Sequence, residues 1–218
     1  MRGRDDLFEF WSQIGRGENI HPADKKTFER MPAQQHGFRL DCLPACFGGR
    51  LRDAPVVMLY LSPGFSENDV ADAQNEESKD YYMRRYSGYE PPRHLLNEKS
   101  TWFSSRTKCF GDWEQVRDKI AVLNIGAYHS RDVKSKSALM ALPSSRVCLD
   151  WAQDVLFSDA EAGRRIVICM RSAALWGLAV GRQYSGLLFA PVVNRAGHLA
   201  KNEENAGLIK TVRERLVA

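Results

Sequence analysis

Four short runs of consecutive apolar residues stand out along the chain, at residues 56–61, 120–125, 165–170 and 187–193. Each run is rich in β-branched side chains and is bounded by turn residues, which predicts a strand buried on both faces. Stretches with helical spacing accompany the runs, at residues 66–74 and onward through 84, 144–160, 172–181 and 204–217. This alternation predicts an α/β fold, as a three-layer α/β/α sandwich with a short, mostly parallel four-stranded central sheet.

Other parts of the chain fall outside this alternation, although we expect a single domain over residues 1–218. Within residues 1–54, positions 6–16 have the pattern of a short amphipathic helix. Positions 17–54 are rich in Gly, Pro and basic residues, which indicates an irregular segment covering the core. Residues 78–115 form an aromatic-dense insertion that contains Tyr81, Tyr82, Tyr86, Tyr89, Trp102, Phe103 and Trp113. These rings either stack on bases and roof a pocket or pack as a subdomain.

Composition narrows the class of protein. At 218 residues with 44% hydrophobic content, the chain is long enough to bury one sizeable core. A formal net charge of +4 is compatible with nucleic-acid binding but is too small to indicate it. No apolar run is long enough to span a membrane and the N-terminus lacks the pattern of a signal peptide, so we expect a cytoplasmic protein with no membrane partner. The five cysteines are scattered, which suits reduced thiols better than a disulfide framework.

The first apolar run leads into the sequence Ser62-Pro63-Gly64-Phe65-Ser66. Pro63 fixes its own φ, Gly64 lets the backbone approach a ligand closely, and Ser66 with Asp69 forms a plausible capping box. A turn of this kind directs backbone N–H groups and a helix N-terminus at one point, which suits an anion such as a phosphate. The alternative is an ordinary strand-to-helix turn.

Polar groups also follow the second and fourth predicted strands. Asn124, Tyr128 and His129 come after the second strand, and Asn194, Arg195 and His198 come after the fourth. An amide can pair with the edge of a nucleobase, and an aromatic ring can stack on its face. Because ligands bind at the carboxyl ends of the strands in open α/β sheets, we expect these strand ends to converge on one pocket.

Together these motifs resemble the uracil-DNA glycosylase superfamily over roughly residues 40–218. Ser62-Pro63-Gly64 is similar to the Asn-Pro-Gly that follows the first strand in the mismatch-specific branch. Leu123-Asn124 resembles the strand end that supplies the base-reading amide in the uracil-specific branch, and residues 166–176 resemble a strand-turn-helix with a small residue after the turn. The last motif, 194–199, looks like the Asn-Pro-Ser-Gly-Leu or His-Pro-Ser-Pro-Leu of the two branches.

The resemblance implies catalytic roles for several residues, and at one position, Ser62, this chain departs from the family pattern. Ser62 stands where the family has the Asn or Asp that holds the attacking water, so Ser62 can position a water but not deprotonate it. A base then comes from Asp69, Glu67 or Asp72, which are alternatively solvated residues favoured by the helix dipole. Asn194 or His198 stabilises the departing base, and sequence alone does not separate the two.

The resemblance also implies binding roles. The base-binding group comprises Gly64, Phe65, Asn124, Tyr128 and His129, although Phe65 is alternatively a core residue and Asn124 a satisfied buried amide. His129 has no certain counterpart in the family and is included because its strand end faces the expected pocket. Arg195 and Leu199 fill the gap left by a flipped nucleotide or touch phosphates, with Arg195 alternatively an exposed loop cation. Other phosphate contacts are expected from Lys134 and Lys136 and from Arg84, Arg85 and Arg106, although such a cluster is usually a solvated face.

We expect neither a metal nor a cofactor. Three residues rather than two separate Cys42 from Cys46, and Cys109 and Cys148 lie far from them, so the spacing does not favour the iron–sulfur cluster that some members of the superfamily carry. Cys169 has the position of a small core residue. The chain also lacks the His-x-Glu with Cys-x-x-Cys motif of zinc deaminases, the Walker motif of nucleotide triphosphatases and the Rossmann glycine pattern of dehydrogenases.

The predicted function is therefore that of a DNA glycosylase, a hydrolase of base-excision DNA repair acting on a uracil-like, damaged or modified base. We expect a monomer that binds duplex or single-stranded DNA. Two alternatives stay open, namely a catalytically silent nucleic-acid-binding protein with the glycosylase fold and a small-molecule nucleoside hydrolase.

Overall fold

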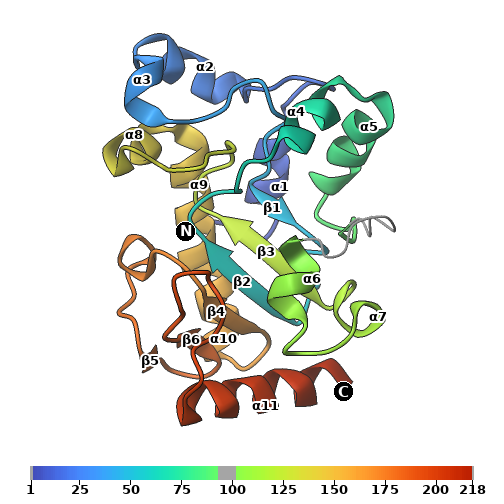
Figure 1. The fold of residues 1–218 in the computed structure, drawn as a ribbon, viewed down its shortest axis with the longest axis vertical. Helices are drawn as coiled ribbons and strands as arrows, with labels where there is room; N and C mark the ends of the chain where they lie inside the picture. Colours follow the sequence, from blue (N-terminus) through green and yellow to red (C-terminus); the bar gives the residue numbers. More distant parts are fainter. Residues whose placement is uncertain (1, 93–101, 218) are drawn as a thin grey trace. The chain divides into compact units, whose positions relative to one another are not determined.

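The structure, a computed structural model, describes residues 2–92 and 102–217 and is a mixed α/β fold with a mostly parallel six-stranded sheet (Figure 1). The strand order is β1-β3-β2-β4-β6-β5. Strand β2 (Val56–Tyr60) runs parallel to β4 (Ile166–Cys169), with Val56 opposite Ile166. Strand β4 runs parallel to β6 (Leu188–Ala190), and β3 (Ile120–Asn124) lies on the other side of β2. Every residue of these four strands is buried, which accounts for their continuous apolar runs.

The expectation of four strands was wrong in number, because two further short strands border the predicted ones. Strands β1 (Phe47–Gly48) and β5 (Arg182–Gln183) have two residues each. A two-residue strand carries no periodic signal, and both residues of β5 are polar and exposed. Strand β5 pairs antiparallel with β6, with Arg182 opposite Ala190. The short, polar edge is a common way to discourage pairing with another chain.

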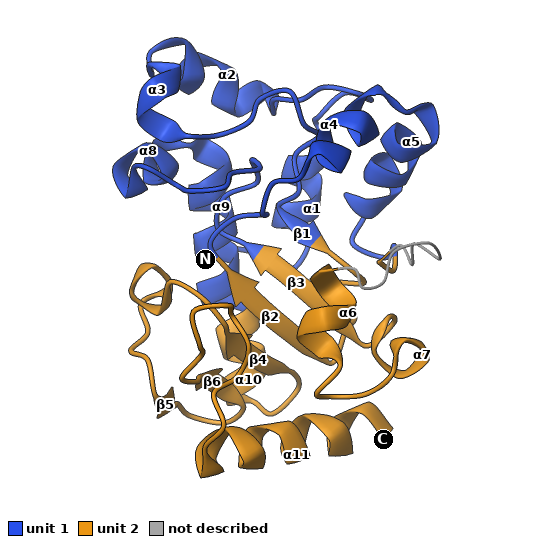
Figure 2. Cartoon of the chain, in the orientation of Figure 1, with its two compact units in different colours: residues 1–47, 61–90, 124–155 blue, residues 48–60, 91–123, 156–218 orange. Residues whose placement is uncertain are grey.

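The chain folds into two compact units, each assembled from three separate segments (Figure 2). The first unit comprises residues 1–47, 61–90 and 124–155, and the second comprises residues 48–60, 91–123 and 156–218. The predicted aromatic insertion is divided between them, since Tyr81, Tyr82 and Tyr86 belong to the first unit and Trp102, Phe103 and Trp113 to the second. Residues 93–101 of that insertion lie outside the described residues.

The core of the second unit lies on one face of the sheet. Alternate strand residues, among them Val56, Met58 and Tyr60, point into it. Helix α11 (Glu203–Val217) adds Leu208, Val212 and Leu216, which follow helical spacing. Helices α6 (Trp102–Thr107) and α7 (Trp113–Val116) contribute to the same core, and the short helix α10 (Ser158–Glu161) completes the helices of this unit in the described chain.

The first unit is built mainly from helices. They are α1 (Asp6–Trp11), α2 (Pro22–Glu29), α3 (Ala33–His36), α4 (Glu67–Gln74), α5 (Glu76–Arg85), α8 (Lys136–Ala141) and α9 (Pro143–Trp151). Helix α9 packs against α1, α2 and α8. Trp11 and Trp151 are almost completely buried, and Phe8 makes edge-to-face contacts with Trp151 and Phe47. None of the described helices has the length and apolar character needed to cross a membrane.

Several predicted helices have different bounds in the structure. The covering segment 17–54 contains α2 and α3. The helix expected from 66 through 84 is interrupted at Asn75, whose side chain accepts a hydrogen bond from the Ser78 N–H and begins α5. The helix expected over 144–160 changes to a π-helix at Ala152–Phe157 before α10, and the one over 172–181 is reduced to a 3₁₀ helix at Ala173–Trp176.

Candidate functional site

The turn after β2 and the loop after β3 are joined by main-chain hydrogen bonds within the first unit. The Gly126 N–H donates to the Leu61 carbonyl at 2.8 Å, and the Ser130 N–H donates to the Pro63 carbonyl at 3.2 Å. A Cβ at Gly126 would lie 2.5 Å from a methyl group of Leu139, so glycine at this position lets Leu139 pack against the loop. The predicted neighbourhood of these two strand ends is therefore observed.

The predicted capping box is confirmed. Helix α4 begins at Glu67, and Asp69 Oδ2 accepts hydrogen bonds from the Ser66 N–H at 2.6 Å and from Ser66 Oγ at 3.0 Å. These bonds use one oxygen of the carboxylate and hold Asp69 directly behind the Ser62-Pro63-Gly64 turn.

Asp69 forms a pair with His129 beside this turn. His129 Nδ1 lies 2.7 Å from the Gly64 carbonyl oxygen and 3.4 Å from Asp69 Oδ2. Because a carbonyl oxygen only accepts hydrogen bonds, Nδ1 carries the proton. The imidazole is 5% exposed, and its Nε2 has no hydrogen-bond partner among the described residues. In neutral His129, Nε2 is thus a buried acceptor lone pair without a partner.

The ionised form of Asp69 is favoured at this position. Burial by itself raises the pKa of the carboxyl, but the hydrogen bond and charge of His129, together with the bonds from Ser66, outweigh burial and lower it. The other two candidate bases, Glu67 and Asp72, have different hydrogen-bond partners. Glu67 is exposed and accepts a hydrogen bond from Arg131 at 3.2 Å, and Asp72 accepts one from Ser78 Oγ at 2.6 Å. Ser62 is half-buried in the turn.

Phe65 lies at the surface of the same turn and is half-buried rather than a core residue. The guanidinium carbon of Arg39 lies 4.2 Å from the centre of its ring, and that of Arg131 lies 5.1 Å away. Both distances are typical of cation–π contacts. Gly64 next to it is exposed, and a Cβ there would meet nothing within 4 Å. The turn therefore presents an aromatic ring, two cations and an open position.

The two predicted base readers in the loop after β3 are both buried. Asn124 is 5% exposed and donates one N–H to the Ala45 carbonyl at 2.9 Å, which leaves its second N–H for another partner. Tyr128 is completely buried, donates to Asp24 at 2.6 Å and accepts from the His21 N–H at 3.2 Å. Both hydrogen-bonding directions of its hydroxyl are used inside the first unit, so Tyr128 has the partners of a packing residue, and its base-binding role stays a prediction.

The motif after β6 forms a small hairpin in the second unit, with Val193 paired to Leu199. Asn194 Oδ1 accepts from the His198 N–H at 3.0 Å and closes the turn, while Arg195 is exposed. Leu199 is half-buried against the core of the unit. Asn205 of α11 anchors the loop, because its Nδ2 donates to the Val192 and Ala200 carbonyls at 2.8 Å each.

His198 is held as a neutral imidazole. Its Nε2 accepts a hydrogen bond from Arg106, since a guanidinium only donates. Burial lowers its pKa, and the charges of Arg106 and Lys108 lower it further. The positive charge at this hairpin therefore comes from exposed Arg195, from Arg106, and from Arg171, whose Nη2 donates to the Arg195 carbonyl at 2.6 Å. Sequence reasoning missed Arg171, although a cation directly after a buried strand was the available signal.

The remaining predicted cations differ in their surroundings. Lys134 and Lys136 are exposed beside the start of α8, consistent with either solvation or a polyanionic ligand. Arg85 donates to the Phe47 carbonyl and lies over the Tyr82 ring, and Arg84 is paired with Glu90, so both already have partners within the first unit.

A metal centre and a surface groove are two other kinds of possible ligand site. Within residues 2–92 and 102–217, no three His, Cys, Asp or Glu side chains come together as metal ligands. A groove of about 530 Å³ lies in the second unit beside β5 and α11, and its described lining contains none of the predicted site residues.

Comparison of the chain with protein-family models, curated proteins and solved structures found no match. The structure shows a mixed α/β protein with a mostly parallel sheet. The candidate site is therefore described by the contacts of its own residues, without reference to a known family. The structure joins two strand ends in the first unit and two in the second; the convergence of all of them on one pocket stays a prediction.

Proposed function

We propose that the protein hydrolyses the N-glycosidic bond of a uracil-like, damaged or modified base flipped out of DNA. The observation that carries the proposal is the Asp69–His129 pair behind the Ser62-Pro63-Gly64 turn, with its unpartnered Nε2. The proposal includes a three-layer arrangement of the uracil-DNA glycosylase kind, a monomer that binds duplex or single-stranded DNA, and a cytoplasmic location.

The chemistry follows from the proton positions. Because Nδ1 carries the proton, Nε2 of neutral His129 accepts one from a water that attacks C1′ of the sugar. The new bond joins C1′ to the water oxygen, and the bond from C1′ to the base nitrogen breaks with its electrons leaving on the base. The Asp69 carboxylate stabilises the imidazolium that forms, which is the role of the acid in other carboxylate–histidine pairs.

The other residues of the turn have supporting roles. The Ser62 hydroxyl orients the water, which replaces the function of an acid at that position in the resembled family. The open space beside Gly64 accommodates the sugar or base, and the exposed part of Phe65 contacts the extruded nucleotide. The second N–H of Asn124 remains for the edge of the base.

The test uses duplex and single-stranded oligonucleotides that each carry one altered base, followed by alkali to cleave abasic sites. Wild-type protein is expected to cleave at least one substrate. In His129→Asn, the side-chain amide still donates to the Gly64 carbonyl but the Nε2 atom is missing, so cleavage should fall by about 10²–10⁴-fold with folding retained. Asp69→Asn should also lower the rate, whereas Glu67→Gln should not, because Glu67 is exposed and its hydrogen bond is to Arg131 rather than to His129.

Two outcomes would contradict this mechanism. Unchanged cleavage by folded His129→Asn would exclude Nε2 as the base. A blank panel for the wild-type protein, with salt-sensitive DNA binding retained, would instead support the catalytically silent binding protein, which the serine at position 62 favours. Turnover of free nucleosides without DNA affinity would support the small-molecule hydrolase.

A further inference from the structure

The second unit contains a buried hydroxyl group without a partner, at the carboxyl end of β2. Tyr60 is the last residue of the strand and is 5% exposed. Its Oη has no hydrogen-bond partner among the described residues. An unsatisfied buried hydroxyl costs free energy, and buried polar groups in native proteins are almost always paired, so this one calls for an explanation.

An aromatic ring and a cation lie next to Tyr60. Trp102 of α6 makes an edge-to-face contact with the Tyr60 ring at 4.9 Å between ring centres, and Trp102 itself is 47% exposed. The guanidinium of Arg106, one turn further along α6, lies 5.9 Å from the centre of the Trp102 ring and donates to His198. Because His198 is neutral, it leaves the charge of Arg106 uncompensated.

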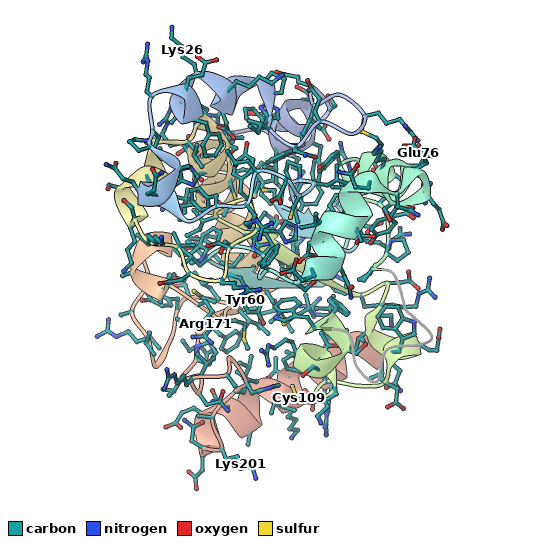
Figure 3. All side chains as sticks on the ribbon, turned by 45° about the horizontal axis from the view of Figure 1, so that its top comes forward. Lys26, Tyr60, Glu76, Cys109, Arg171 and Lys201 are labelled. Atoms are coloured by element: carbon teal, nitrogen blue, oxygen red, sulfur yellow. The ribbon has the colours of Figure 1, made fainter. Side chains whose placement is uncertain are left out.

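A second cation, Arg171, lies two residues after the end of β4. Arg171 donates to the Arg195 carbonyl, and its guanidinium packs against Gly197, where a Cβ would lie 3.1 Å from Nη2. Figure 3 shows Arg171 and Tyr60 in the same region. In the described chain, neither Arg106 nor Arg171 forms an ion pair with a carboxylate. Burial raises the pKa of Tyr60, and the charges of Arg106 and Arg171 oppose that rise.

We infer that Tyr60, Arg106 and Arg171 form a binding site for a phosphate group. The hydrogen-bond donors and the positive charges of these three side chains indicate a phosphate group as the ligand. Two guanidiniums and a phenol offer hydrogen-bond donors with positive charge, and neither guanidinium is paired with a carboxylate within residues 2–92 and 102–217, which is the arrangement that recognises phosphate oxygens. Each guanidinium has five N–H groups and uses few of them here, so several remain. The exposed part of Trp102 provides a surface for the nucleoside attached to that phosphate.

The phosphate has two possible sources, a DNA backbone or a free nucleotide. The DNA source rests on the proposed function, whereas the phosphate site itself does not. Binding is therefore measured directly by calorimetry, without turnover, using inorganic phosphate, deoxyuridine monophosphate, deoxyuridine and an oligonucleotide. Deoxyuridine monophosphate is expected to bind and deoxyuridine is not. Competition by the oligonucleotide assigns the site to a DNA backbone, and its absence assigns the site to a free nucleotide.

Tyr60→Phe is the decisive variant, because it removes only the hydroxyl group. Phosphate affinity should fall about tenfold, while the thermal stability of the free protein stays the same or rises, since the hydroxyl has no partner there. Arg171→Gln should also weaken binding. The matched control is Arg182→Gln, which removes the same charge from exposed strand β5 of the same unit.

Three results would overturn the inference: phosphate affinity unchanged in Tyr60→Phe, an equal loss of affinity in Arg182→Gln, or no phosphate binding by the wild-type protein. His129→Asn separates this inference from the proposed function. If both are right, that variant loses base cleavage and keeps phosphate affinity. A wild-type protein that binds phosphate through Tyr60 but cleaves no substrate would retain the site and contradict the glycosylase.

Discussion

At the scale of single residues, two buried atoms without partners point to ligands. His129 Nε2 and Tyr60 Oη are both enclosed, and both lack a hydrogen-bond partner among the described residues. The neighbouring groups differ in charge. His129 is backed by the Asp69 carboxylate, which suits an atom that accepts a proton, whereas Tyr60 lies under the influence of two guanidiniums, which suits an atom that donates to an anion.

Gly64 provides a test at the residue scale. It does not have a left-handed φ, and a Cβ would meet nothing within 4 Å. Gly64→Ala should therefore change the free energy of unfolding by less than about 1 kcal/mol. The added methyl group occupies the space proposed for the nucleotide, so base cleavage should fall roughly tenfold or more.

The control for Gly64→Ala is the same substitution at a glycine that also has free space for a Cβ but lies in another part of the chain. A Cβ at Gly207 in α11 would also meet nothing within 4 Å, and Gly207→Ala should stabilise the helix by up to about 1 kcal/mol with cleavage unchanged. Denaturant titration and the oligonucleotide assay on both variants check this. Full activity of Gly64→Ala would show that no ligand approaches the turn.

At the scale of elements, local hydrogen bonds decide where the helices of the first unit begin. His21 is the N-cap of α2, and its Nδ1 accepts from the Ala23 N–H at 3.2 Å. Its Nε2 lies 2.8 Å from the Phe10 carbonyl, so Nε2 carries the proton and the imidazole is neutral. The ring also stacks on Phe10 at 3.9 Å between centres. A histidine therefore does here what Ser or Asp usually does at a helix start.

The His21 cap makes the stability of the first unit depend on pH. Burial lowers the pKa of His21. The hydrogen bond to the Phe10 carbonyl and the charges of nearby acids raise it, but burial is the larger effect. A lowered folded-state pKa means that the unfolded chain binds the proton more readily. The contribution of His21 is thus complete above its ordinary pKa of about 6.5 and is lost as the pH falls through the lower folded-state value.

Unfolding free energies measured between pH 8 and pH 5 check this expectation. They should decrease toward acid in the wild-type protein and decrease less in His21→Asn, because Asn caps a helix without titrating. His36 has a lowered pKa for the same principal reason, burial, so the slope should decrease further in the double variant with His36→Asn. An identical slope in His21→Asn and the wild-type protein would rule out the cap as its source.

At the scale of the whole molecule, electrostatics decides how the protein meets a polyanion. The net charge is only +4, so attraction to DNA depends on where cations lack acidic partners. Lys134 and Lys136 are exposed in the first unit, and Arg171 and Arg195 lie at the hairpin of the second. Each unit thus carries cations beside the candidate residues it contributes.

DNA affinity should accordingly fall linearly with salt concentration on a double-logarithmic plot. Replacing both Lys134 and Lys136 by Gln should reduce the slope by about two, since each phosphate contact contributes about 0.9 for duplex DNA. The control is Lys26→Gln with Lys210→Gln, which removes the same charge from other exposed positions. Fluorescence anisotropy at several salt concentrations measures the slopes, and equal slopes in the two double variants would exclude a specific contact at Lys134 and Lys136.

What the sequence determined by itself are the features that depend on neighbours along the chain. The four buried strands were found within three residues of their ends, because a strand buried on both faces must be continuously apolar. The Ser66–Asp69 capping box was found because its hydrogen bonds span three residues. Strands β1 and β5 were missed, since two residues carry no period.

Only the tertiary structure decided which polar groups meet. His129 reaches the Gly64 carbonyl across 65 residues of sequence, and Arg106 reaches His198 across 92. Such pairings follow from the strand order and from loops that fold back on the strand ends, neither of which leaves a local pattern. Tyr60 shows the same limit, because its place in an apolar run predicted only burial. The absence of a partner for its hydroxyl among the described residues became visible once the chain was folded.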